Sequence, residues 1–243
     1  MKDSIKQEIN NLVQGEKDKT PYLALMFAIV IIFIYCYFGS YSFFEQTFPN
    51  ISDLDYYKII YHNSMSFILF FCLGTLFVKF VMKKNLKDYG LCLGEKKIGK
   101  YIMLLAIVVV PIITLTVLLS PEMIQTYPLV DLNVYNKWWQ WALYFFSYVL
   151  YYIGWEFIFR AVLLFGVKDR FGFLGAIFVT ALISALIHTS IAGFGKPMVE
   201  TLSAIFAGFI FAGITLRTKS IYYSLFIHIL VGICTDLYIF FLV

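Results

Sequence analysis

The sequence predicts an all-α membrane protein, a polytopic bundle of about seven transmembrane helices. The 243-residue chain is 61% hydrophobic and only 14% charged, with a mean hydropathy of +0.81, whereas a soluble domain carries about a quarter charged residues. Apolar runs of about 20 residues recur along its length. Lys and Arg lie mainly beside these runs, so the net charge of +4 indicates membrane topology and not nucleic-acid binding.

The apolar segments can be placed in order, each near the length that a helix needs to cross a bilayer. The third segment contains Pro111, which predicts a kink. The fourth is long enough to tilt or to project beyond the membrane. The last three are joined by short polar turns and should be antiparallel neighbours. The predicted spans are 22–44, 64–82, 101–120, 138–167, 173–188, 200–216 and 221–243.

Basic residues predict the orientation, because cytoplasmic connections are enriched in Lys and Arg. With alternating spans, most of them fall on one side, which places the protein in the cell membrane with a cytoplasmic N-terminus. Residues 1–20 are then a cytoplasmic arm, with a short amphipathic surface helix, and 21–243 form a single integral membrane domain. Only Lys58, Lys137 and Lys196 lie on the opposite side.

Four ionisable side chains lie deep within apolar segments. Glu156 and Arg160 are four residues apart, so they share a helix face on which a carboxylate and a guanidinium can pair. His188 and His228 lie in later segments. Because ionisable groups at membrane depth are costly and usually functional, these residues predict a reaction centre.

Each candidate also has a purely structural interpretation. The Glu156–Arg160 pair could only fix helix packing, and His188 could bond an interfacial carbonyl. Glu200 could be a carboxylate favoured by a helix start, and Asp236 could cap structure near the chain end. Glu156 and the two histidines could also bind zinc. Because there is no H-E-x-x-H motif, we expect no cofactor, with zinc as the alternative.

Three motifs resemble the CAAX-protease and bacteriocin-processing (CPBP, or Abi) intramembrane proteins. That family has E-E-x-x-x-R, F-x-x-x-H and H-x-x-x-N or H-x-x-x-D on successive helices. Other segments are similar too, and the resemblance covers roughly 85–240. The corresponding stretches here are Trp155-Glu156-Phe-Ile-Phe-Arg160, Ser184-Ala-Leu-Ile-His188, His228-Ile-Leu-Val-Gly232, Tyr89-Gly-Leu-Cys-Leu-Gly94, Phe206-Ala-Gly208, Leu216-Arg-Thr-Lys-Ser220 and Gly195-Lys-Pro197-Met-Val-Glu200.

The resemblance implies metal-free amide hydrolysis, in which a glutamate and a histidine activate water while a histidine and an asparagine hold the oxyanion. Three positions depart from the pattern, of which the first is Ser184, where the family has phenylalanine. Trp155 stands where the family has its first glutamate, so Glu156 carries the base role, Glu200 enters from the loop side, or the chain is inactive. Gly232 stands where the family often has asparagine, and Asp236 could compensate by orienting His228.

The functional expectation is an intramembrane endopeptidase that cuts a membrane-associated peptide or protein, with membrane lipid as its other partner. The alternatives are an inactive relative that acts as a bacteriocin-immunity factor or membrane scaffold, and an ion or solute transporter. At a rise of 1.5 Å per residue, Glu156 and His228 lie about 10–15 Å from the cytoplasmic helix ends. His188 and Glu200 lie at about 25 Å. A single site then requires strong tilt or a fifth helix that starts deeper, and otherwise there are two polar clusters.

Overall fold

The computed structural model of the protein describes residues 18–189 and 195–243, and within these ranges it contains helices and no strand. The predicted all-α fold class is therefore confirmed. Most of the predicted arm 1–20 lies outside the described residues. Six helical ranges are long and apolar enough to cross a membrane: Thr20–Phe38, Leu54–Val81, Lys96–Leu119, Trp138–His188, Met198–Thr218 and Tyr222–Leu242.

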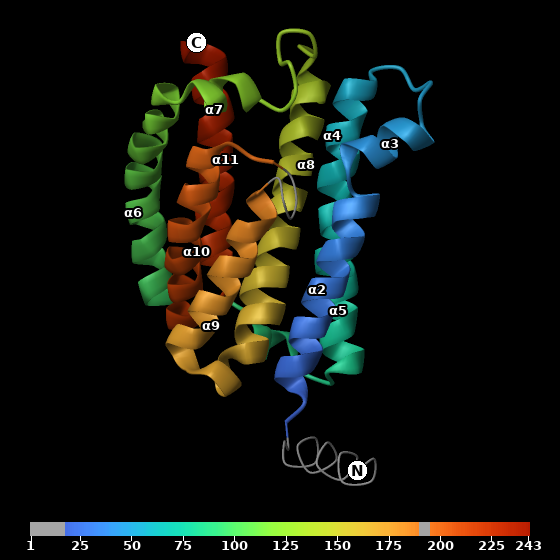
Figure 1. Ribbon diagram of the computed structural model, residues 1–243. Coiled ribbons are helices and arrows are strands. Elements are labelled where there is room, and N and C mark those ends of the chain that lie inside the picture. Colours follow the sequence, from blue (N-terminus) through green and yellow to red (C-terminus); the bar gives the residue numbers. More distant parts are fainter. Residues whose placement is uncertain (1–17, 190–194) are drawn as a thin grey trace.

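The fourth of these ranges crosses twice, because the chain reverses direction at Gly172. Gly172 has φ 70° and ψ 178° inside α9, a region of backbone space that is essentially restricted to glycine. Figure 1 shows this turn at the lower end of the bundle, where α9 folds back upward beside α8. The six ranges thus provide seven crossings, as the sequence predicts.

The first two crossings form one side of the bundle. Helix α2 (Thr20–Phe38) is followed by the short α3 (Tyr41–Thr47). The second crossing is continuous and contains two π-helical stretches: α4 (Leu54–Ser66), η1 (Phe67–Cys72), α5 (Leu73–Leu76) and η2 (Phe77–Val81).

Two predicted boundaries were wrong here. The first span ends at Phe38 and not at residue 44, because the chain turns at Gly39 and Ser40 before α3. The second span begins at Leu54 and not at residue 64. The residues before 64 are polar in sequence, but some of their polar side chains are bonded inside the protein, as Asn63 is to Ser147.

The remaining elements include most of those that line the candidate site. They are η3 (Leu86–Tyr89), α6 (Lys96–Thr114) with Pro111 inside it, η4 (Leu115–Leu119), α7 (Pro121–Thr126), α8 (Trp138–Glu156), the π-helical η5 (Phe157–Leu163), α9 (Leu164–His188), α10 (Met198–Thr218) and α11 (Tyr222–Leu242). Figure 1 shows α10 and α11 between α6 on one side and α8 and α9 on the other.

Glycines allow the closest helix approaches. A Cβ at Gly208 of α10 would lie 3.1 Å from the Cα and Cβ of Ala181 in α9. A Cβ at Gly99 of α6 would overlap the ring of Tyr223 in α11. The loop after η3 is also fastened to the α10–α11 turn, because Ile221 donates its N–H to the Gly90 carbonyl at 3.1 Å. These contacts join α9 to α10, α6 to α11, and the loop after η3 to the α10–α11 turn.

A polar cavity as candidate active site

A cavity with about 560 Å³ of empty space, including its open mouth, lies between the later helices and the start of the second crossing. All three histidines of the chain line it, with five tyrosines and both members of the predicted ion pair. Its lining residues are Tyr41, His62, Asn63, Tyr127, Leu129, Tyr148, Tyr151, Tyr152, Trp155, Glu156, Phe159, Arg160, Ser184, His188, Lys196, Glu200 and His228.

Five of the six predicted site residues therefore face a single cavity, which excludes the alternative of two separate polar clusters. The fifth crossing begins after Gly172, and its end at His188 reaches only the level of Trp155. The two rings are 6.1 Å apart at their centroids. The chain then folds back, with the N–H of Lys196 donating to the His188 carbonyl at 2.8 Å.

Glu156 and Arg160 lie at the centre of α8 and η5, where the helix widens into a π-helical stretch immediately after Glu156. Such local widening is frequent at functional sites. The Glu156 and Arg160 side chains are 1% and 3% exposed, and their nearest charged atoms, Oε2 and Nε, are 3.8 Å apart. The guanidinium also lies 5.7 Å from the centre of the Phe211 ring. Arg160 thus neutralises the buried carboxylate without saturating it with short hydrogen bonds.

The other oxygen of Glu156 contacts α11. Its Oε1 lies 2.8 Å from Nδ1 of His228. His228 is 28% exposed, and its ring packs between Tyr152 at 4.3 Å and Phe211 at 5.1 Å, measured between centroids. A buried carboxylate therefore fixes one nitrogen of an imidazole at the cavity wall.

His188 is fixed in a similar way by the backbone. Its Nδ1 lies 2.7 Å from the carbonyl oxygen of Ser184, one turn earlier in α9. Trp155, which stands where the resembling family has its first glutamate, stacks against His188 at an interplanar angle of 29° and against Phe159 at 15°. The residue beside His188 is therefore an indole where that family has a carboxylate.

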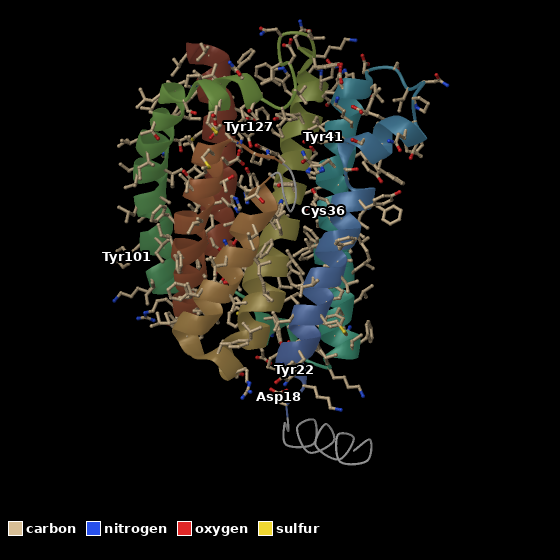
Figure 2. The ribbon with its side chains drawn as sticks, in the orientation of Figure 1. Asp18, Tyr22, Cys36, Tyr41, Tyr101 and Tyr127 are labelled. Carbon is tan, nitrogen blue, oxygen red and sulfur yellow. The ribbon has the colours of Figure 1, made fainter. Side chains whose placement is uncertain are left out.

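Glu200 belongs to a second charged group at the cavity. Its two carboxylate oxygens accept the Tyr127 hydroxyl at 3.0 and 2.9 Å. Lys196 donates to the same phenol oxygen at 2.7 Å and lies 3.9 Å from Glu200. Burial and the negative charge of Glu200 raise the pKa of Tyr127 well above its usual value. Figure 2 labels Tyr127 and Tyr41, both in the half of the molecule away from Asp18.

Asp236 is not among the residues that line the cavity, and it does not fill the possible role of orienting His228. It is fully buried, and its Oδ2 accepts the hydroxyl of Tyr144 at 2.6 Å. Two helical turns, about 12 Å, separate it from His228 along α11, and Glu156 occupies the imidazole nitrogen instead. Asp236 therefore anchors α8 to α11 beyond the site.

His62 and Tyr152 were not predicted as site residues. His62 was missed because the second span was expected to begin at residue 64. Its Nε2 lies 2.9 Å from the Tyr35 hydroxyl and its Nδ1 lies 2.6 Å from the Gly39 carbonyl. Both ring nitrogens are thus engaged, which makes His62 a poor proton acceptor. Among the described residues, no group of His, Cys, Asp and Glu has the arrangement of a metal site.

One comparison with protein families found a match. Residues 137–234 match the model of the family described as Type II CAAX prenyl endopeptidase Rce1-like. This match confirms the resemblance to CAAX-protease-type intramembrane proteins over α8 to α11. It includes Glu156, His188 and His228, and it ends before Asp236. No curated protein and no solved structure matches the chain.

Proposed function

We propose that this protein is an intramembrane endopeptidase that hydrolyses a peptide bond in a membrane-associated peptide or protein. The observation that carries the proposal is the Glu156–His228 pair, at 2.8 Å, in a cavity that also contains His188. The match to a family described as CAAX prenyl endopeptidases supports the same class of reaction.

His228 is the base that this geometry supports. An ionised carboxylate can only accept hydrogen bonds, so the shared proton belongs to Nδ1 of His228 and Nε2 keeps its lone pair. A carboxylate that fixes the tautomer of an imidazole in this way is the arrangement that activates nucleophiles in many hydrolases. Glu156 orients His228 and stabilises the imidazolium that forms during the reaction.

His188 presents a second nitrogen to the same water. The Ser184 carbonyl also only accepts, so His188 carries its proton on Nδ1 and leaves Nε2 open. The water oxygen bonds to the substrate carbonyl carbon while His228 takes one proton and His188 accepts a hydrogen bond from the other. The carbon–nitrogen bond then breaks, and the proton on His228 passes to the leaving amine.

Arg160 and Glu200 have supporting roles in this proposal. Arg160 holds Glu156 in place from within the same helix. Glu200, with Lys196 and Tyr127, lies at the cavity wall on the side of the loop before α10. These charged groups are placed to bind polar backbone groups of an incoming peptide, whose membrane anchor would remain in the surrounding lipid.

The test measures new protein N-termini in membranes from cells that produce the wild-type protein or its variants. We expect a set of termini that is present with the wild type and absent with Glu156→Gln, because the loss of an orienting carboxylate costs about 10⁴-fold in rate in a comparable arrangement. His228→Gln should abolish the same termini while leaving the Glu156–Arg160 pair intact. A synthetic farnesylated peptide ending in a CAAX sequence tests the prenylated substrate class directly.

The controls separate chemistry from folding and from the alternatives. Each variant is compared at equal abundance in the membrane. Identical termini in wild type, Glu156→Gln and His228→Gln would disprove the protease and favour a non-catalytic scaffold, in which Trp155 fills the place of a catalytic carboxylate. Loss of the termini in Glu200→Gln, with Glu156→Gln still active, would assign the base to Glu200.

A further inference from the structure

The position of Tyr152 gives it a role that the sequence pattern does not suggest. Tyr152 lies one helical turn before Glu156 on α8, so both side chains share a face. Its ring is 4.3 Å from the ring of His228, and its side chain is 7% exposed at the cavity wall. The phenol is therefore next to the imidazole to which we assign water activation.

The hydroxyl of Tyr152 also explains Gly232. A Cβ built on Gly232 would overlap the Tyr152 hydroxyl oxygen and would lie 2.8 and 2.9 Å from two of its ring carbons. Gly232 is one turn beyond His228 on α11, so any side chain at 232 would occupy the space that the phenol now fills. Tyr152 can therefore occupy this position only because residue 232 is a glycine. Its hydroxyl places a hydrogen-bond donor beside a residue that has no side chain to donate.

Hydrolysis at this site needs such a donor. When water adds to the substrate carbonyl, the C=O electrons move to oxygen, and the resulting oxyanion must be stabilised by a fixed donor. Nδ1 of His228 bonds to Glu156, so it cannot serve as this donor. A tyrosine hydroxyl can donate in this way, as it carries one O–H and remains neutral.

We propose that the Tyr152 hydroxyl is the oxyanion donor of this enzyme, in the space that Gly232 leaves open. The proposal rests on the peptidase function argued above. It makes Tyr152 a catalytic residue, and it assigns Gly232 the role of admitting the phenol between α8 and α11.

The first test removes the hydroxyl alone. Tyr152→Phe keeps the ring against His228, so we expect kcat on a synthetic peptide that spans a Glu156-dependent cleavage site to fall about 100- to 1,000-fold with KM little changed. Tyr56→Phe is the matched control. This variant removes the hydroxyl of another buried tyrosine, which donates to the carbonyl of Gln140 in α8 at 2.7 Å. Tyr56 is not among the residues that line the cavity, so kcat of Tyr56→Phe should equal that of the wild type.

The second test moves the donor to the facing helix. Gly232→Asn alone should impair the enzyme, because its side chain collides with Tyr152. In Tyr152→Ala/Gly232→Asn the space is vacated and an amide donor takes it. We expect this double variant to regain at least about tenfold in kcat over Tyr152→Ala, a gain that one fixed oxyanion donor can supply. Tyr152→Ala/Gly232→Leu fills the same space without a donor. A purely structural role of Tyr152 would give equal rescue in both double variants, whereas the oxyanion role gives it with asparagine alone.

The outcomes distinguish the two proposals. Wild-type kcat in Tyr152→Phe, with Glu156→Gln inactive, would overturn the oxyanion assignment and leave the peptidase in place. Absence of Glu156-dependent cleavage in every variant would overturn the peptidase itself. A fall in kcat that Tyr152→Ala/Gly232→Asn does not relieve would limit Tyr152 to packing and would also reject the assignment.

Discussion

At the scale of single residues, one buried carboxylate connects two kinds of interaction. Glu156 neutralises Arg160 through one oxygen and fixes His228 through the other. A buried charge that loses its partner is strongly destabilising, whereas replacing both partners by neutral groups often is not. The ion pair and the proposed chemistry can therefore be separated by experiment.

We expect Arg160→Met to lower the free energy of unfolding by about 3–5 kcal/mol, because it leaves Glu156 as an uncompensated buried charge. Glu156→Gln/Arg160→Met should recover most of that loss while remaining inactive. Unfolding of the purified protein in detergent measures both. Equal stability of the single and double variants would contradict the account, since it would mean that Glu156 does not need the guanidinium.

Tyr127 provides a prediction on pH. Burial and the charge of Glu200 hold the pKa of Tyr127 well above its ordinary value. Above pH of about 10, the unfolded chain releases this proton while the folded protein keeps it, so stability must fall as the pH rises. Below that pH, Tyr127 stays protonated in both the folded and the unfolded state, so its contribution to stability does not change with pH.

The melting temperature of the wild type should therefore fall more steeply above pH of about 10 than that of Tyr127→Phe, and the two curves should run parallel at neutral pH. Thermal unfolding in detergent across this range measures the difference. Curves that stay parallel above pH of about 10 would show that Tyr127 is not held in its protonated form by the fold.

Residues show clearly where sequence analysis succeeds and fails. Glu156, Arg160 and the two later histidines could be found because charge inside an apolar helix is conspicuous. His62 could not, because its segment is polar enough to look like a loop, and only the partners Tyr35 and Gly39 explain its burial. Contacts between helices, such as that between Tyr152 and Gly232, are likewise invisible in a single sequence.

At the scale of elements, the short return leg of α9 brings His188 to the same cavity as Glu156 and His228. The sequence gives the length of this leg correctly as 173–188, and Gly172 starts it. The close packing of α9 on α10 is what fixes His188 beside Trp155.

That packing can be tested with two glycines of the same helix. Gly208→Leu should force α10 away from Ala181, where even a Cβ would lie at 3.1 Å, and should lower the melting temperature and any cleavage together. Gly213→Leu is the matched control, because no other group lies within 4 Å of a Cβ at that position. If both variants behaved alike, the close approach at Gly208 would not be what positions α9.

At the scale of the whole molecule, the basic residues gather at one end of the bundle. The first crossing begins there, and the α9 turn and the α10–α11 turn lie at the same end (Figure 1). The segment before α6 is held to this end as well, since Glu95 donates its N–H to the Thr218 carbonyl at 2.8 Å. The opposite end carries α3, α7 and the loop before α8.

Because Lys and Arg concentrate on cytoplasmic connections, we predict that the end holding the segment 83–100 faces the cytoplasm and that the loop before α8 faces outward.

The test uses single cysteines in a variant in which the four native cysteines are replaced by serine. Lys97 and Asn133 are both exposed and lie at opposite ends of the bundle. An impermeant thiol reagent added to intact cells should label Asn133→Cys, and it should label Lys97→Cys only after the membrane is opened. The reverse pattern would invert the topology, and it would place the wall formed by Glu200, Lys196 and Tyr127 nearer to the cytoplasm. Since a protein substrate must approach from one side, this single experiment also decides from which compartment the charged wall of the cavity receives it.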